Sequence, residues 1–113
     1  MQRRDWRLRV ADVIAAAERI ARFTAGETYQ QFLADEKLVA AVCYELMIIG
    51  EAAKAVPGEV EARAAGLDWA EMRAMRNIVA HEYFGVDRKI VWDTATRDVP
   101  AIIGPLRRLL EDG

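Results

Sequence analysis

The segment between Asp35 and Pro57 constrains the fold of this chain more than any other part of the sequence. Its apolar residues recur every three or four positions, which is the spacing of one face of an α-helix. The apolar surface is wide, and a helix of this kind packs against several neighbours or against a partner chain. We therefore predict a central helix from about Asp35 to just before Pro57-Gly58, with an apolar surface made by Leu38, Val39, Val42, Cys43, Leu46, Met47, Ile49, Ala53 and Val56.

The N-terminal part of the chain has the same periodicity and predicts a long first helix from about Arg4 to Phe23, which Thr24-Ala25-Gly26 ends. A short helical turn is expected over 28–33, and a second short amphipathic piece over 59–65. The apolar face of the first helix comprises Trp6, Val10, Val13, Ile14, Ala17, Ile20 and Ala21, and the short turn carries Tyr29 and Phe32.

A capping pattern opens the next helix: Asp68 is the N-cap, and Glu71 stands three residues later, where its side chain can reach back. This third long helix is predicted to end near Gly85, because glycine is a common C-terminal stop.

Asp87 can cap a last helix that runs to about Leu110, and Pro100 and Gly104-Pro105 should kink or split it. The chain has 113 residues with only seven glycines and three prolines, and it shows no repeat or linker. We therefore predict one domain over residues 1–113, an all-α bundle of four to five helices.

Charge and cysteine content narrow the class of protein. The net charge of −2 argues against a protein that coats nucleic acid without specificity, although a local basic site is compatible with it. The one cysteine, Cys43, cannot form an internal disulfide, which suits a reducing cytoplasm, and its apolar surroundings favour a buried thiol over a nucleophile. No CxxC or HExxH spacing occurs, so we predict no metal site and no cofactor.

The termini and apolar runs give no sign of membrane insertion. The basic N-terminus is not followed by an uninterrupted apolar stretch, so it reads as the start of an amphipathic helix and not as a signal peptide. The longest apolar runs fall short of a membrane span. We expect a soluble, cytoplasmic protein that does not bind membranes.

Residues 76–83, with the sequence RNIVAHEY, hold the only histidine of the chain. His81 is therefore the first candidate for acid–base chemistry at neutral pH. On an ideal helix Arg76 and Tyr83 lie on nearly the same face, and Asn77 shares another face with His81. Arg76 and His81 are separated by roughly 140° around the axis. Either the long arginine reaches around the helix, or a second copy of the chain completes the site.

A second copy has a chemical advantage. Metal-free RNA cleavage needs a base for the ribose 2′-hydroxyl, an acid for the leaving oxygen and cationic donors for the charge that develops on phosphate. Two motifs that face each other in a homodimer would supply two histidines and two arginines. The residues also permit structural roles, in which His81 only packs, Arg76 pairs with a carboxylate, Asn77 is a surface residue and Tyr83 belongs to the core.

The chain resembles the HepT group of HEPN-domain proteins, the toxins of HepT/MntA (HEPN/minimal nucleotidyltransferase) toxin–antitoxin modules. The resemblance covers almost the whole length in ordered blocks: Arg4-Asp5, the Ile48-Ile49-Gly50-Glu51-Ala52-Ala53-Lys54 block, Trp69, the block from Met75 to Tyr83, Val86-Asp87, Ile90-Val91-Trp92 and Asp98-Val99-Pro100.

The resemblance implies a HEPN fold, homodimerisation and a metal-independent ribonuclease site where two motifs meet. Arg76 and His81 would be catalytic, Asn77 would support them, and Tyr83 would be the tyrosine that an MntA-like nucleotidyltransferase antitoxin modifies with AMP. The family's substrate is RNA, and some members cleave tRNA. Two departures stand out: Tyr44-Glu45 replaces an arginine that many relatives carry in the second long helix, and Asp68 replaces a common proline.

A weak basic patch surrounds the motif in sequence, and its members are candidate RNA contacts: Arg73, Arg88 and Lys89. We expect cleavage by transesterification, which leaves a 2′,3′-cyclic phosphate. Two alternatives stay open on the sequence alone. One is a non-catalytic helical dimer that binds a nucleotidyltransferase, a nucleotide or RNA, and the other is a helical scaffold without a site.

Overall fold

The computed structural model describes residues 5–83 and 87–112, and within these ranges it leaves out the side chains of residues 79–83. Every regular element in these ranges is helical. The α-helices are α1 (Asp5–Thr24), α2 (Tyr29–Ala34), α3 (Glu36–Lys54), α4 (Gly58–Glu61), α5 (Trp69–Tyr83), α6 (Arg88–Asp93) and α7 (Val99–Asp112). A 3₁₀ turn, Ala62–Ala64, follows α4, and a π-helical turn, Thr94–Asp98, joins α6 to α7.

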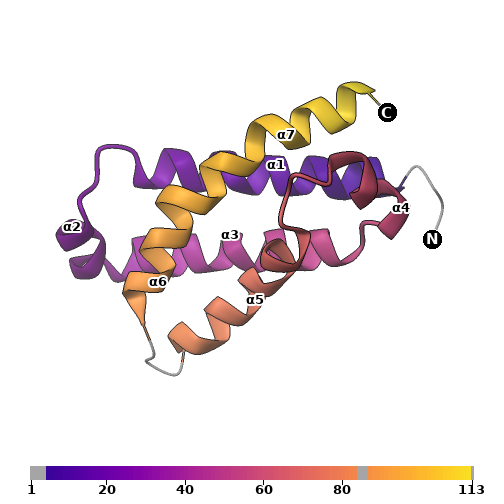
Figure 1. The fold of residues 1–113 in the computed structure, drawn as a ribbon. Helices are drawn as coiled ribbons and strands as arrows, with labels where there is room; N and C mark the ends of the chain where they lie inside the picture. Colours follow the sequence, from indigo (N-terminus) through magenta and orange to yellow (C-terminus); the bar gives the residue numbers. More distant parts are fainter. Residues whose placement is uncertain (1–4, 84–86, 113) are drawn as a thin grey trace.

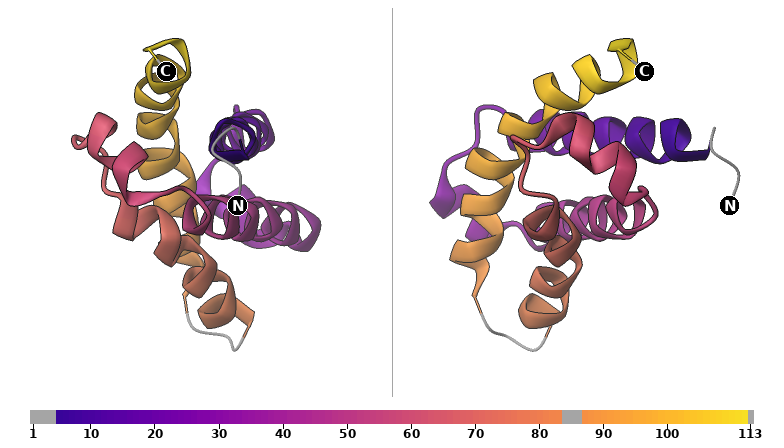
Figure 2. Two further views of the ribbon diagram at one scale, coloured as in Figure 1. Left: turned by 90° about the vertical axis from the view of Figure 1, so that its right-hand side faces the viewer. Right: turned by 45° about the vertical axis from the view of Figure 1, so that its right-hand side comes forward.

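The long helices form the all-α bundle that the sequence predicts. Helices α1 and α3 run side by side, α7 packs on α1, and α5 packs on α3 (Figure 1). Helix α5 slants away from α1, so its C-terminal turns lie on the opposite side of the molecule from the end of α7 (Figure 2). The last part of α7 is tied back by Arg7 of α1, whose Nη2 donates to the Leu110 carbonyl at 2.6 Å.

Helix α3 is the centre of the core, as its apolar surface predicts. It contacts both α1 and α5 and buries side chains toward each of them. Cys43 is also buried, which confirms the predicted packing role of the thiol. The side chains of α3 with no exposed surface are Val42, Leu46, Ile49 and Ala53.

The predicted starts of α2, near Thr28, and of α3, near Asp35, coincide with helix caps. Thr28 and Gln31 form a reciprocal capping box at α2, and the Asp35 carboxylate accepts from the Leu38 N–H at the start of α3. Gly26 has a φ of 75°, a left-handed conformation that follows the end of α1. The predicted boundaries at Arg4 and Gly85 lie outside the described residues.

The last helix corrects one detail of the prediction. The interruption falls at Thr94–Asp98, before Pro100, and α7 continues through Gly104-Pro105 without ending there. Pro100 has no N–H to offer the carbonyl four residues earlier, and its ring crowds that carbonyl. The π-helical turn widens the backbone at this point, and the Val99 N–H bonds to Thr94 O instead. None of the described helices has the length and apolar character needed to cross a bilayer.

Candidate functional site

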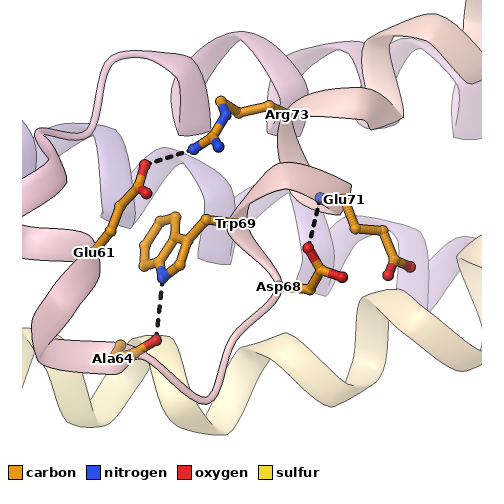
Figure 3. Close-up of polar contacts among 6 residues, drawn as sticks. All are labelled: Glu61, Ala64, Asp68, Trp69, Glu71 and Arg73. Atoms are coloured by element: carbon orange, nitrogen blue, oxygen red, sulfur yellow. Dashed lines mark hydrogen bonds and ion pairs between the residues drawn. The ribbon is translucent and has the colours of Figure 1, made fainter.

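The beginning of α5 is fixed by polar contacts on both sides (Figure 3). The Asp68 carboxylate accepts from the Glu71 N–H at 2.9 Å, which confirms Asp68 as the N-cap. The buried Trp69 indole donates from Nε1 to Ala64 O at 3.1 Å. One turn later Arg73 forms an ion pair with Glu61 at 2.6 Å. These contacts set the direction in which α5 carries the motif.

The other half of the predicted capping box is not formed as expected. Hydrogen bonding with the Asp98 carboxyl is the main cause that raises the pKa of Glu71 above its ordinary value of 4.5, with smaller contributions from desolvation and from Asp68. Asp98 ends the π-helical turn, so the contact links the start of α5 to the start of α7. The periodicity of the sequence could not predict that Asp98 lies near Glu71, because the π-helical turn that ends at Asp98 changes the direction in which its side chain leaves the helix.

Gly50 lets the backbones of α3 and α5 approach closely at the first residue of the motif. A Cβ on Gly50 would lie 2.7 Å from Arg76 Cβ and 2.8 Å from Arg76 N. Real Cβ atoms do not make contacts this short, so any larger residue would push the helices apart. The backbone of Arg76 is therefore held directly against α3.

The residue after Gly50 binds the arginine side chain. Glu51 Oε1 lies 2.9 Å from Arg76 Nη1, and the two side chains are 50% and 52% exposed. The guanidinium is thus at the surface while one of its donors is engaged by α3. This confirms the sequence interpretation in which Arg76 pairs with a carboxylate, and it leaves the catalytic prediction open.

Asn77 lies beside a small cleft between α5 and α6. The cleft has a volume of about 280 Å³, and its lining is apolar apart from Asn77 and Asp87: Ala74, Asn77, Ile78, Asp87 and Ile90. His81 follows Asn77 by one helical turn, and Tyr83 is the last residue of α5. The side chains of His81 and Tyr83 lie outside the described part of the structure, so their predicted roles stay predictions.

The three candidate RNA-binding cations all contact groups of the same chain. Arg73 pairs with Glu61, and Lys89 Nζ lies 2.6 Å from Asp93 Oδ1. Arg88 donates to Leu33 O at 3.4 Å. RNA would have to compete with these partners, and a role for the three cations in RNA binding stays a prediction.

Tyr44-Glu45, the departure from the relatives, has two different environments. Glu45 is buried and receives a hydrogen bond from Arg19 Nε of α1 at 2.9 Å, so its charge is engaged by α1. Tyr44 is 57% exposed, and Met47, one turn later, is 38% exposed. Both lie on the same stripe of α3 as Glu51, because the residues are spaced by three and four. An apolar surface thus adjoins the Glu51–Arg76 pair.

Sequence reasoning did not assign Gly50 and Glu51 to the site, although both belong to the block that carries the family resemblance. A glycine followed by an acid inside a long apolar helix is the signal that could have indicated a close helix contact and a partner for an arginine. Within the described ranges, no three His, Cys, Asp or Glu side chains are grouped to hold a metal ion.

An all-α bundle in which one helix, α5, carries an R-x4-H-x-Y segment has the character of a HEPN domain. The chain belongs to the HepT-like family, because the family model described as "Ribonuclease HepT-like" matches residues 13–109.

Two relatives illustrate the similarity. A protein of Thermococcus cleftensis named "Probable ribonuclease HepT" is 38% identical over 98 residues, which cover 87% of this chain and 89% of the relative. A protein of Methanocaldococcus jannaschii named "Putative RNase MJ0125" is 30% identical over 112 residues, 99% of this chain and 97% of the relative. No solved structure matches the chain significantly.

Proposed function

We propose that this chain is a metal-independent endoribonuclease, the toxin of a toxin–antitoxin pair that acts in the cytoplasm, and that Arg76 and His81 carry the reaction. The observation that supports this most is the placement of Arg76: α3 holds its backbone and one guanidinium nitrogen, while about half of the side chain faces solvent. The relatives named as ribonucleases support the choice of RNA as the substrate.

The proposed chemistry is a transesterification. The ribose 2′-hydroxyl attacks the adjacent phosphorus, the bond to the 5′-oxygen of the next nucleotide breaks, and a 2′,3′-cyclic phosphate and a 5′-hydroxyl remain. His81 takes part in the proton transfer, because histidine is the residue type whose unperturbed pKa lies closest to neutral pH, and His81 is the only histidine of the sequence. Arg76 stabilises the negative charge that grows on the phosphate oxygens, for which its planar fork of donors is suited.

We further propose that the active site is shared by a homodimer. Arg76 and His81 diverge by roughly 140° on one helix, and a second copy would bring the missing group to each motif. The exposed apolar side chains Tyr44 and Met47 lie beside Glu51, on the side of α3 that a partner chain would cover. Sedimentation of wild type against Tyr44→Glu tests this arrangement. A dimer that the substitution dissociates supports it, and a monomeric wild type contradicts it.

Regulation is proposed at Tyr83, the last residue of α5. A partner nucleotidyltransferase would add AMP to the phenol, and the bulky anionic group would block RNA and compete for the arginines. The test is an intact-mass spectrum of the protein produced with and without the nucleotidyltransferase. Adenylyl-sized increments that disappear in Tyr83→Phe support the proposal, whereas unchanged masses contradict it.

Nuclease activity is tested with RNA, including tRNA, and protein that is unmodified at Tyr83. We expect wild type to cleave and His81→Ala to lose roughly 10²- to 10⁴-fold in rate, the usual contribution of a positioned general acid or base. RNA binding should persist in the variant. Equal behaviour of the two proteins, with RNA bound but not cut, would instead indicate the non-catalytic binding module.

A further inference from the structure

The Glu51–Arg76 ion pair joins α3 to α5 beside Gly50. Among the described glycines, Gly50 is the one at which an added Cβ would lie closest to a neighbouring helix. A Cβ added to Gly50 would lie only 2.7 Å from Arg76 Cβ, so glycine permits the close approach, and Glu51 is the next residue of α3. The carboxylate therefore starts from a position that the helix contact fixes, and it reaches Arg76 Nη1 at 2.9 Å. Fixed backbones on both sides limit the directions in which the guanidinium can point.

The pair is poorly placed to stabilise the fold. Its side chains are half exposed, and ion pairs at this depth contribute little because water screens them and ordering two long side chains costs entropy. By contrast, the ion pair of Arg19 with Glu45 between α1 and α3 has a buried carboxylate, with the Glu45 side chain 8% exposed. A surface carboxylate on an arginine of the motif is thus better explained by the position that it gives to the guanidinium than by folding.

The geometry is also compatible with a bound phosphate. A guanidinium carries five N–H donors in a planar fork, and the contact with Glu51 uses Nη1. The same group can therefore hold Glu51 and a phosphate oxygen at the same time. A carboxylate that fixes the plane of the fork would reduce the entropy that Arg76 loses when the transition state forms.

We propose that Glu51 is a positioning residue for the RNA-cleavage reaction, which orients the Arg76 guanidinium toward the reacting phosphate. This inference rests on the proposed ribonuclease activity. It assigns to Glu51 an effect on the rate of the chemical step, and it predicts no loss of RNA affinity, because removal of a negative charge near the RNA cannot weaken binding electrostatically.

The test compares wild type, Glu51→Ala and Glu51→Gln in single-turnover cleavage and in RNA binding. Glu18→Ala is the matched control, because Glu18 also forms a surface ion pair between two helices, with Arg107 of α7, and its loss changes the net charge equally. We expect Glu51→Ala to cleave about 10- to 100-fold more slowly, with unchanged or tighter RNA binding. Glu51→Gln should fall between the two, since its amide oxygen can still accept from Arg76, and Glu18→Ala should match wild type.

Three results would overturn the proposal: Glu51→Ala that cleaves as fast as Glu18→Ala, a faster variant, or a loss confined to RNA affinity. A wild type that cleaves no RNA would contradict both the proposed function and this inference. If wild type is active, the comparison with Glu51→Ala tests the role of Glu51 alone. NMR relaxation of the Arg76 Nε–H group gives a readout that needs no RNA. It should show an ordered guanidinium in wild type and a disordered one in Glu51→Ala, and equal disorder in both would contradict positioning.

Discussion

The two halves of α5 differ in what they contact. In the first half Trp69 is 6% exposed, and Met72 and Met75 are each 1% exposed, so this half belongs to the core. In the second half Arg76 and Asn77 are exposed, and the described contacts to the rest of the chain include the close approach to Gly50, the ion pair with Glu51 and the packing of Ile78 against the core. One helix thus separates residues that stabilise the fold from residues that carry the proposed chemistry. Substitutions along it should therefore change either stability or cleavage.

Trp69→Ala should have the largest effect on stability. The substitution removes a buried aromatic side chain and its hydrogen bond to Ala64 O, so we expect a loss of about 3–5 kcal/mol in unfolding free energy. Trp69→Phe keeps most of the packing and should lose about 1 kcal/mol through the hydrogen bond. Denaturant unfolding measures both. A loss below 1 kcal/mol for Trp69→Ala would show that the start of α5 is not anchored in the core.

Arg76→Ala should have the opposite profile. The expected loss in cleavage rate is about 10²- to 10³-fold, comparable with removal of one transition-state donor. The free energy of unfolding should change by less than about 1 kcal/mol, because the ion pair with Glu51 is half exposed. Arg107→Ala, which breaks the surface pair with Glu18, controls for charge. Cleavage that falls equally in both variants would argue against a specific role for Arg76.

Gly50→Ala tests the close contact between α3 and α5, which involves both Arg73 and Arg76. The added Cβ would meet the Arg76 backbone at 2.8 Å, so α3 and α5 must move apart, and we expect a loss of about 1–3 kcal/mol. Gly104→Ala is the matched control inside α7. Its Cβ would meet only the flexible end of Arg108 at 3.5 Å, so alanine should stabilise the helix by about 0.5–1 kcal/mol. If thermal unfolding showed that both variants are more stable than wild type, or that both are equally destabilised, the close approach at Gly50 would be contradicted.

Asp98→Asn should have the smallest effect, and it concerns the first half of α5. The folded chain holds the Glu71 proton more tightly than the unfolded chain does, because the pKa of Glu71 is raised chiefly by Asp98. Wild type should therefore lose stability as pH rises from 4.5 through the raised pKa, and the variant should lose less. Both groups are exposed, so the difference at pH 7 should stay below about 1 kcal/mol. An NMR titration should show that the pKa of Glu71 is closer to 4.5 in the variant than in wild type. The same Glu71 pKa in both proteins would contradict the interaction between Glu71 and Asp98.

Much of the fold could be predicted because its signals are local. Apolar periodicity predicts α1 and α3, and the capping residues Asp68 and Asp87 predict where α5 and α6 begin. The π-helical turn could not be predicted from the sequence. A proline such as Pro100 indicates that a helix is irregular nearby, but it does not determine the type of irregularity or the residues at which it occurs. Pro105, which the sequence predicts to be equally disruptive, lies inside a continuous α7.

The site was predictable only in part. The motif named Arg76 and Asn77, and helical geometry showed that Arg76 and His81 diverge. The partner of Arg76 comes from α3, and a contact between residues 25 positions apart depends on how two helices pack, which no local pattern encodes. Gly50 was visible in the sequence, but its reason became clear only with the backbone of α5 beside it.

The most direct test of the central claim is cleavage of end-labelled RNA by the folded, unmodified protein in excess EDTA, with Arg76→Ala and His81→Ala beside wild type. We expect wild type to produce 2′,3′-cyclic phosphate ends without metal, and both variants to stay folded and lose cleavage. Wild type that leaves RNA intact, or variants that cleave as fast as wild type, would contradict the assignment of Arg76 and His81 to catalysis.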